Sequence, residues 1–517
     1  MTTSSFRPGR RLAAVAGAVA IGAASLFGAT AAQAAPGNID STTPGSITIH
    51  KHLESGSTPA NPDGSGGVTG EAVAGVDFDI YELNYLGEPM DLTRFDDWTG
   101  LSGVTLTAAC DVQAPSDFSL GAKAATVTTT ADGSVVFDAG TERKAYAVCE
   151  TDTTGASVGG EAVTIVKKAA PFVVSVPMPY ENEWLYAVHA YPKNTTAGIV
   201  KTIESQPADA VGLGSVITFP VTTDIPRLAE GDDLTGYVVR DVLDDRLSPV
   251  SVESVTVNGT DVDPAFYDVI VNASNAQDIR VVFNAEGLEW LGTQGGQQLV
   301  TVFAGSVIEL GNGTILNDAI LFVNDPDADN DVAPNPGIPS NEVESHWGDL
   351  IIRKVDAAND KNLSGATFQI YNADPAYVAD GTACTSTTTS GNPISVNGAD
   401  SFETNADGTV TVAGLFVSDS ENDPKNAAQR CYVTVETAAP AGYTLPTGDA
   451  AKTAVTVKTG QTATGTFDVS VPNTKQDVPE LPLTGASGQL IMTLGGAALI
   501  AIAAGLVMAR RRRAIQE

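Results

Sequence analysis

Apolar and polar residues alternate along the stretch Ser46-Ile47-Thr48-Ile49-His50-Lys51-His52-Leu53. A period of two is the repeat of a β-strand, because successive side chains point to opposite faces of a sheet. The alternation recurs less strictly at 237–243 and 279–284, and cleanly at 409–412 and 466–471. Clusters of Asp, Asn and Gly separate these segments, a pattern typical of β-sandwiches. The sequence therefore predicts an all-β protein.

The N-terminus predicts export. Arg7, Arg10 and Arg11 precede an apolar run that ends in the small-x-small site Ala32-Gln33-Ala34. This order is that of a secretory signal peptide, which we expect to be cut before Ala35.

The C-terminus predicts anchoring at the cell surface. The stretch Leu481-Pro482-Leu483-Thr484-Gly485 is followed by an apolar segment, 490–509, and by arginines at 510–513. The apolar segment is long enough to span a membrane, and the arginines would stay in the cytoplasm. The three parts in this order resemble a sortase sorting signal. In such a signal the membrane holds the substrate while a sortase cysteine attacks the Thr484 carbonyl and releases the tail.

The charge of the chain restricts its partners. The sequence holds 28 basic and 62 acidic residues among 517, a net charge of −34. The expected mature chain carries about −40. Such a chain repels nucleic acid and anionic membranes, so neither is an expected partner. Its apolar fraction of 43% is ordinary, which excludes a disordered protein.

Four cysteines, Cys110, Cys149, Cys384 and Cys431, allow three pairings. They lie as two distant couples, so we expect the disulfides Cys110–Cys149 and Cys384–Cys431, formed in the oxidising environment after export. A catalytic cysteine is the rival interpretation, but no adjacent histidine motif supports it. The sequence shows no catalytic triad, metal cluster or nucleotide loop, so we expect neither an enzyme nor a cofactor.

An acidic segment is a candidate calcium site. Asp325, Asp327, Asp329 and Asp331 alternate, but the segment lacks the Gly and the distal Glu of an EF-hand loop. We therefore expect a solvated acidic linker and no metal.

Three lysines, three acids and three asparagines fall in the apolar phase of strand patterns. They are Lys51, Lys201 and Lys354; Glu150, Asp241 and Glu436; Asn194, Asn317 and Asn473. Burying an unpaired charge is costly, so such a lysine must be neutral or reacted. One residue of each type falls in each expected domain, in the order lysine, acid, asparagine, which suggests a shared chemistry.

In that chemistry, a desolvated lysine has a depressed pKa and attacks the asparagine carboxamide. A buried, protonated carboxyl would hydrogen-bond the carbonyl and shuttle protons. Ammonia leaves, and an isopeptide bond joins the first strand of the domain to the last. The alternative is three independent lysines that extend to the surface and three ordinary asparagines, and periodicity alone favours that alternative.

Two further motifs carry a family resemblance. The stretch Cys431-Tyr432-Val433-Thr434-Val435-Glu436-Thr437-Ala438-Ala439-Pro440-Ala441-Gly442-Tyr443 resembles the pilin E-box, YxLxETxAPxGY, with Thr434 in place of Leu. The stretch Trp184-Leu185-Tyr186-Ala187-Val188-His189-Ala190-Tyr191-Pro192-Lys193 resembles the pilin motif WxxxVxVYPK, with Ala190 in place of Val. With the sorting signal, the whole chain resembles a Gram-positive major shaft pilin of the actinobacterial fimbrial type.

The resemblance implies three tandem Ig-like β-sandwiches. The expected organisation is a signal peptide (1–34), a CnaB-like domain (35–194), a CnaA-like domain (195–335), a CnaB-like domain (336–475), and the linker, sorting signal, transmembrane helix and basic tail (476–517).

The resemblance also assigns roles to single residues. Lys193 would be the amine that sortase joins to Thr484 of the next subunit, and the strand phase points Lys193 outward while Asn194 points inward. Internal bonds would join Lys354 to Asn473 with Glu436, and Lys201 to Asn317 with Asp241, with Asn324 as the alternative to Asn317. A bond between Lys51 and Asn194 with Glu150 is a further option. The resemblance does not require it, because some shaft pilins have no such bond in this domain.

The expected function is that of the repeating subunit of a covalent, wall-anchored fimbria that supports adhesion. Expected partners are pilus-specific and housekeeping sortases, identical subunits, a tip pilin, peptidoglycan, and receptors on host or bacterial surfaces. A monomeric wall-anchored adhesin or accessory pilin is the main alternative, since it would keep the sorting signal without needing the Lys193 motif. A secreted enzyme is the third.

Overall fold

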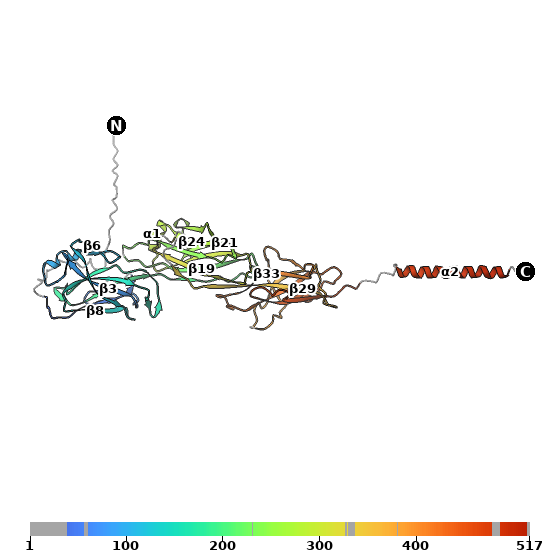
Figure 1. Cartoon of the computed structure of the whole chain (residues 1–517), viewed down its shortest axis with the longest axis horizontal. Helices are drawn as coiled ribbons and strands as arrows, with labels where there is room; N and C mark the ends of the chain where they lie inside the picture. The colour runs from blue at the N-terminus through green and yellow to red at the C-terminus, as the bar shows by residue number, and fades with distance from the viewer. Residues whose placement is uncertain are drawn as a thin grey trace, which may run out of the picture.

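The β-strands gather into three sections that follow one another along an elongated rod, and helix α2 (Ala486–Arg513) extends from its far end (Figure 1). The structure is a computed structural model that describes residues 39–55, 60–229, 231–325, 328, 337–379, 381–477 and 486–513. The expected signal peptide and the Leu481–Gly485 sorting motif lie outside the described residues. The prediction of an all-β chain with a C-terminal apolar helix is confirmed.

The N-terminal section contains one five-stranded sheet and two three-stranded sheets. Their strand orders are β16 (Ala187–Ala190), β1 (Gly45–His50), β8 (Ser134–Gly140); β13 (Phe172–Val176), β9 (Lys144–Asp152), β3 (Asp77–Tyr85), β4 (Glu88–Pro89), with β7 (Phe118–Thr128) also on β3; and β12 (Ile165–Lys167), β17 (Lys193–Thr196), β2 (His52–Leu53). Short hairpins are β5 (Thr105–Leu106) with β6 (Val112–Ala114), β10 (Ser157–Val158) with β11 (Glu161–Ala162), and β14 (Met178–Tyr180) with β15 (Glu183–Leu185). The first strand, β1, and the late strand β16 run parallel, so the start and the end of the section lie side by side.

The middle section is a sandwich of two sheets. One has the order β18 (Ile199–Lys201), β19 (Val216–Asp224), β25 (Gln298–Val307), β21 (Leu247–Val257), β22 (Thr260–Asp261); the other has β23 (Tyr267–Asn272), β24 (Asn275–Phe283), β20 (Tyr237–Val242), β27 (Ala319–Val323), β28 (Ile338–Pro339). Helix α1 (Ala285–Thr293) follows β24, and the Asn284 side chain caps it by accepting a hydrogen bond from the backbone of Gly287. The strand pattern expected to include Asn284 thus ends one residue earlier, at Phe283, because Asn284 begins the helix.

The C-terminal section is a second sandwich that shares a sheet with the middle one. One sheet has the order β26 (Thr314–Asn317), β29 (Val343–Asp356), β33 (Thr409–Asp419), with β36 (Val469–Asn473) parallel to β29; the other has β31 (Thr389–Ser390), β30 (Thr367–Ala373), β34 (Gln429–Ala438), β35 (Lys452–Lys458), with β32 (Phe402–Glu403) on β30. Because β29 pairs with both β26 and β33, one strand runs through both sections. The domain boundary expected near residue 335 stays a prediction.

The last strand begins later than its pattern indicated. Thr466 was expected to open it, but its backbone closes a turn onto Ala463, and β36 starts at Val469. The strand ends on Asn473, which is buried on the same face as Val471, as its phase predicts.

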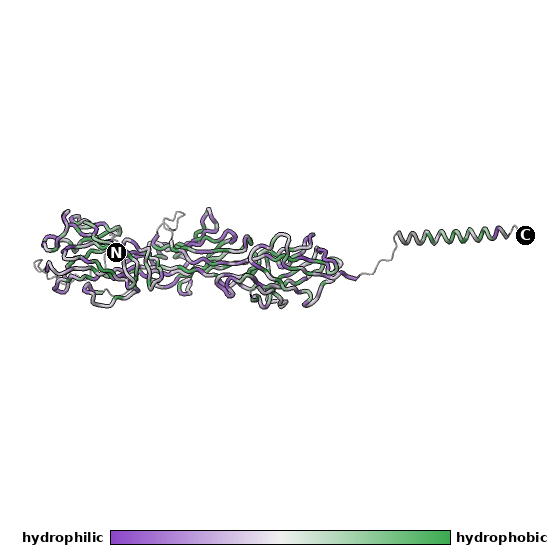
Figure 2. Tube along the Cα trace, turned by 60° about the horizontal axis from the view of Figure 1, so that its bottom comes forward, coloured by the Kyte–Doolittle hydropathy of each residue, from purple (hydrophilic) through white to green (hydrophobic). Residues whose placement is uncertain are grey.

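The apolar segments lie inside the rod and the polar ones on its loops (Figure 2). The middle and C-terminal sections share one continuous hydrophobic core, whereas the N-terminal section has cores of its own. Backbone hydrogen bonds from Leu213 to Gly414 and from Phe416 to Val211 join the middle and C-terminal sections. These two sections therefore form one packed unit.

Candidate functional site

In the C-terminal section, Lys354, Glu436 and Asn473 meet in the core. Lys354 lies on β29 and Asn473 on β36, its parallel neighbour, while Glu436 comes from β34 in the facing sheet. The Lys354 Nζ is 2.6 Å from the Asn473 Oδ1 and 2.9 Å from a Glu436 oxygen. The Asn473 Nδ2 donates to the other Glu436 oxygen at 2.7 Å. All three side chains are buried.

Burial lowers the pKa of Lys354, although the neighbouring Glu436 acts in the opposite direction. A lowered pKa increases the fraction of the lysine that is present as the neutral, nucleophilic amine. The carboxyl bridges the attacking nitrogen and the amide nitrogen, so a proton taken from Nζ can be passed to Nδ2. Glu436 thus faces the nitrogen that would leave, and not the carbonyl against which the sequence hypothesis placed it.

The middle section holds a similar group, Lys201, Asp241 and Asn317. The Lys201 Nζ donates to the Asp241 Oδ2 and, at 3.2 Å, to the backbone carbonyl of Asp318. The Asn317 Nδ2 approaches the same carboxyl oxygen at 3.5 Å. All three side chains are buried; burial lowers the pKa of Lys201 and raises that of Asp241.

The alternative asparagine, Asn324, lies outside this group. Its side chain accepts a hydrogen bond from the backbone of Thr235, and its own backbone has a positive φ of 57°. The Asn324 side chain therefore stabilises a local turn of the backbone.

The N-terminal section brings Lys51, Glu150 and Asn194 together. The Lys51 Nζ is 2.8 Å from one Glu150 oxygen, and the Asn194 Nδ2 donates to the other at 2.7 Å. Asn194 lies on β17, which pairs in parallel with β2, the short strand after Lys51. Burial lowers the pKa of Lys51 to about 8, against the opposing effect of Glu150. Each section thus brings a lysine, an acid and an asparagine together around the carboxyl, and in the C-terminal section the lysine also contacts the asparagine.

One recurring feature was missed in the sequence. Each buried ammonium lies over a phenylalanine ring, with Nζ-to-centroid distances of 5.8 Å for Lys51 and Phe78, 5.2 Å for Lys201 and Phe219, and 5.9 Å for Lys354 and Phe368. Each phenylalanine is an apolar strand residue, and nothing in its local pattern marks it as a partner of a lysine.

Lys193 differs from the other three lysines. It lies on β17 directly before the buried Asn194, and 18% of its side chain is exposed, whereas the other three are fully covered. Its Nζ is 3.5 Å from a Glu54 oxygen. The side chain is less exposed than an outward strand position would suggest, because the segment after β2 lies beside it. Thr484, its expected partner, lies outside the described residues.

The cysteine prediction is confirmed. Disulfides join Cys110 to Cys149 and Cys384 to Cys431, with Cα–Cα distances of 6.0 and 5.5 Å. Each closes a loop within one section.

Helix α2 contains a segment, Met492–Arg511, that is long and apolar enough to cross a membrane. Most of the acidic segment 325–331 lies outside the described residues. Within the part of the chain that the structure describes, no group of three or more His, Cys, Asp or Glu side chains is arranged to hold a metal.

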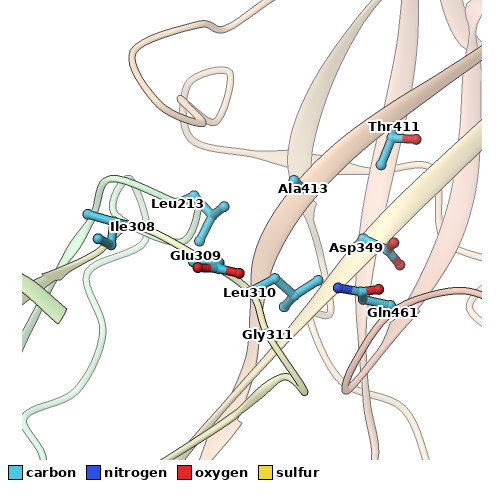
Figure 3. A pocket seen from close by; sticks show the side chains of 9 residues that line it. All are labelled: Leu213, Ile308, Glu309, Leu310, Gly311, Asp349, Thr411, Ala413 and Gln461. Atoms are coloured by element: carbon cyan, nitrogen blue, oxygen red, sulfur yellow. The ribbon is translucent and has the colours of Figure 1, made fainter. Parts of the chain in front are cut away.

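An open cavity of about 370 Å³ lies where the middle and C-terminal sections meet (Figure 3). Its lining residues are Leu213, Ile308, Glu309, Leu310, Gly311, Asp349, Thr411, Ala413 and Gln461. The Asp349 carboxylate is already engaged by the backbone and the hydroxyl of Thr462, at 2.7 Å each. The cavity is the gap between the two sandwiches.

The family comparisons agree with these features. Residues 42–195 match the family of the Gram-positive pilin subunit D1 N-terminal domain, residues 348–470 a prealbumin-like fold domain, and residues 473–514 the LPXTG cell wall anchor motif.

Similar proteins match along the whole chain. Fimbrial subunit type 2 of Actinomyces naeslundii is 39% identical, over 98% of this chain and 97% of its own length. Fimbrial subunit type 1 of Actinomyces viscosus is 30% identical, over 98% of each. The solved structure of the full-length major pilin SpaD from Corynebacterium diphtheriae superposes with a TM-score of 0.66 at 29% identity, covering 85% of this chain and 99% of SpaD. The chain therefore belongs to the family of Gram-positive fimbrial subunits, which are structural proteins rather than enzymes, and it is a cell-wall-anchored pilin of the surface fimbria.

Proposed function

We propose that the chain is the repeating shaft subunit of a covalent pilus, with Thr484 of one subunit joined to Lys193 of the next. A sortase thiol would attack the Thr484 carbonyl and break the peptide bond to Gly485. The neutral Lys193 amine would then attack the thioester, form an amide and return the thiol. At the base of the pilus, an amine of peptidoglycan would take the place of Lys193 under a housekeeping sortase.

The difference in lysine exposure supports this assignment. The side chains of Lys51, Lys201 and Lys354 are fully covered, and each lies in an internal trio. Solvent reaches Lys193, which lies within the segment 42–195 that matches the pilin domain family. A sortase acyl-enzyme can approach only an amine that it can reach.

The three internal trios have a second role in the proposal. Each lysine would attack the asparagine Cγ, so that a C–N bond forms, the Cγ–Nδ2 bond breaks, and ammonia leaves with the proton that the acid carries. The contact of the Lys354 Nζ with both Glu436 and Asn473 is the observation that carries this chemistry. The bonds would be Lys354–Asn473, Lys201–Asn317 and Lys51–Asn194.

These bonds suit a protein under tension. Folding stability is only about 5–15 kcal/mol, so force along the rod can peel a sandwich open from its ends. A covalent link between the start of a section and a strand near its end closes that route. Adhesion, through the shaft or through a tip pilin that it displays, would depend on this strength.

Peptide mapping tests the linkage directly. Polymer released from the wall is digested, and a branched peptide is sought in which the Thr484 carbonyl is joined to the Lys193 amine. That peptide is the expected result. A polymer in which the Thr484 carbonyl is joined to another lysine would overturn the assignment of Lys193, and wall material in which Thr484 is joined to no lysine of the chain would favour the monomeric adhesin.

A further inference from the structure

The loop after Glu436 closes over the end of the last strand. The backbone of Thr444 donates to the Thr474 carbonyl at 3.0 Å, and the backbone of Gln476 donates to the Gly442 carbonyl at 2.8 Å. Tyr443 forms an antiparallel bridge with Lys475. The chain directly beyond Asn473 is therefore held by the same motif that supplies Glu436.

The side chain of Tyr443 ties this loop to β29. Its hydroxyl donates to an Asp356 carboxylate oxygen at 2.9 Å, and Asp356 stands opposite Asn473 in the parallel register of β29 and β36. The next residue, Ala357, donates its backbone N–H to the Asn473 carbonyl at 3.0 Å. One hydroxyl thus links the loop to the end of the strand that carries Lys354 two residues earlier.

The charges suit this contact at neutral pH. The backbone of Ala358 and the Tyr443 hydroxyl lower the pKa of Asp356, with a smaller contribution from the Asn359 side chain. The same contact raises the pKa of Tyr443. An ionised acceptor and a protonated donor are therefore the stable forms.

The last strand needs such support before any bond forms. In the sheet, β36 pairs with β29, on which it runs parallel for five residues from Val469 to Asn473. Its approach is weakly buried, since 41% of Phe467 is exposed. Without a tie beyond Asn473, the strand end can fray and carry the carboxamide away from the amine.

We propose that Tyr443 is a positioning residue for the Lys354–Asn473 bond: its hydroxyl latches the loop and β36 onto Asp356, and so holds the Asn473 carboxamide against the lysine. The inference rests on the bond proposed above. The Tyr443 hydroxyl lies on Asp356, outside the trio, and takes no part in the proton transfers.

The test follows the rate of bond formation in the full-length chain. The chain is synthesised in a cell-free system, synthesis is stopped, and samples are quenched at intervals and digested. Mass spectrometry then gives the fraction of Lys354 joined to Asn473 and, in the same digest, of Lys201 joined to Asn317. Tyr443→Phe should slow the first bond about tenfold, the effect of one hydrogen bond to a charged group, and leave the second unchanged.

A double-mutant cycle separates a latch from general weakening. Asp356→Asn, which keeps an acceptor oxygen but not its charge, should fall between the wild type and Tyr443→Phe, and Asp356→Ala should be as slow as Tyr443→Phe. The double variant Tyr443→Phe with Asp356→Ala should be no slower than Asp356→Ala. The matched control is Tyr371→Phe, which removes a hydroxyl that donates to Gln369 at 3.1 Å on β30, and it should not change the rate.

The outcomes are distinct. If the wild type contains no joined peptide, the proposed bond itself fails. If the wild type is joined and Tyr443→Phe is equally fast, the bond stands and the latch is wrong. Effects that add in the double variant would also overturn the latch, because they would show that the two residues act independently.

Discussion

Replacing Asn473 by alanine removes the carboxamide that Lys354 would attack. The buried lysine keeps its carboxylate partner, because the Lys354 Nζ lies 2.9 Å from Glu436. The substitution therefore removes the proposed covalent link without leaving an isolated buried charge, whose cost would otherwise dominate the result.

The expected loss of stability follows from the loop that the bond closes. Lys354 and Asn473 are 119 residues apart in the sequence. A cross-link over such a loop lowers the entropy of the unfolded chain by an amount worth about 5 kcal/mol, by the relation used for disulfides. Because the middle and C-terminal sections form one packed unit, that corresponds to a fall of about 10 °C in the Tm of their shared transition.

Calorimetry and intact-mass measurement on the same samples test this prediction. In Asn473→Ala the transition shared by the middle and C-terminal sections should fall by about 10 °C, and the lost mass of one ammonia molecule should be restored. The matched control is Asn372→Ala, another buried asparagine of this section, which donates to Ala208 and accepts from Arg430. It should cost only about 1–3 kcal/mol. Equal shifts in the two variants, or a wild type that retains all its ammonia, would refute the reasoning.

Three further predictions concern other parts of the chain. In Asn194→Ala, Lys51 stays unreacted with a pKa of about 8 in the folded state instead of 10.5, so the unfolded state binds more protons between these pH values. Denaturant titrations should therefore show the free energy of unfolding rising with pH in this range, by up to about 3 kcal/mol. The wild type lacks this rise if Lys51 is an amide, and a fall with pH in the variant would contradict the assignment. Glu436→Ala should block the C-terminal bond alone, and mass spectrometry should then show one ammonia molecule retained; loss of that ammonia would exclude its role. Replacing both Cys110 and Cys149 by serine, which opens a link across 39 residues, should cost about 4 kcal/mol in the N-terminal transition of a calorimetric scan and leave the C-terminal one unchanged; a shift of the C-terminal transition would contradict it.

Much of the fold could be predicted because alternation reports which residues face a core. Tyr237 to Val242 form β20 almost as the pattern indicates, and the spacing of the cysteines gives the correct pairs. Burial of Lys51, Lys201 and Lys354 also follows from strand phase, since Lys201 and Lys354 lie on the apolar side of their strands and Lys51 continues the alternation of β1.

The rest depends on contacts between distant segments. Helix α1 was not predicted. The segment is short and follows a strand directly, and the Asn284 side chain caps its first turn. Strand β29 was expected in one domain, but its length lets it pair with both β26 and β33. The phenylalanine rings over the lysines come from other strands, and their register is set by the packed sandwich rather than by any local pattern.

The role of Lys193 is tested most directly on material released from the wall of cells that make the wild type, Lys193→Ala or Lys167→Ala. Lys167 is the matched control, since it lies opposite Thr195 across β12 and β17, and 35% of its side chain is exposed. Samples are boiled in detergent with reductant and separated by size. We expect a ladder of high-mass multimers in the wild type and Lys167→Ala, and monomer alone in Lys193→Ala. A ladder that survives in Lys193→Ala would move the linkage to another lysine, and a single monomer band in all three strains would contradict the shaft function.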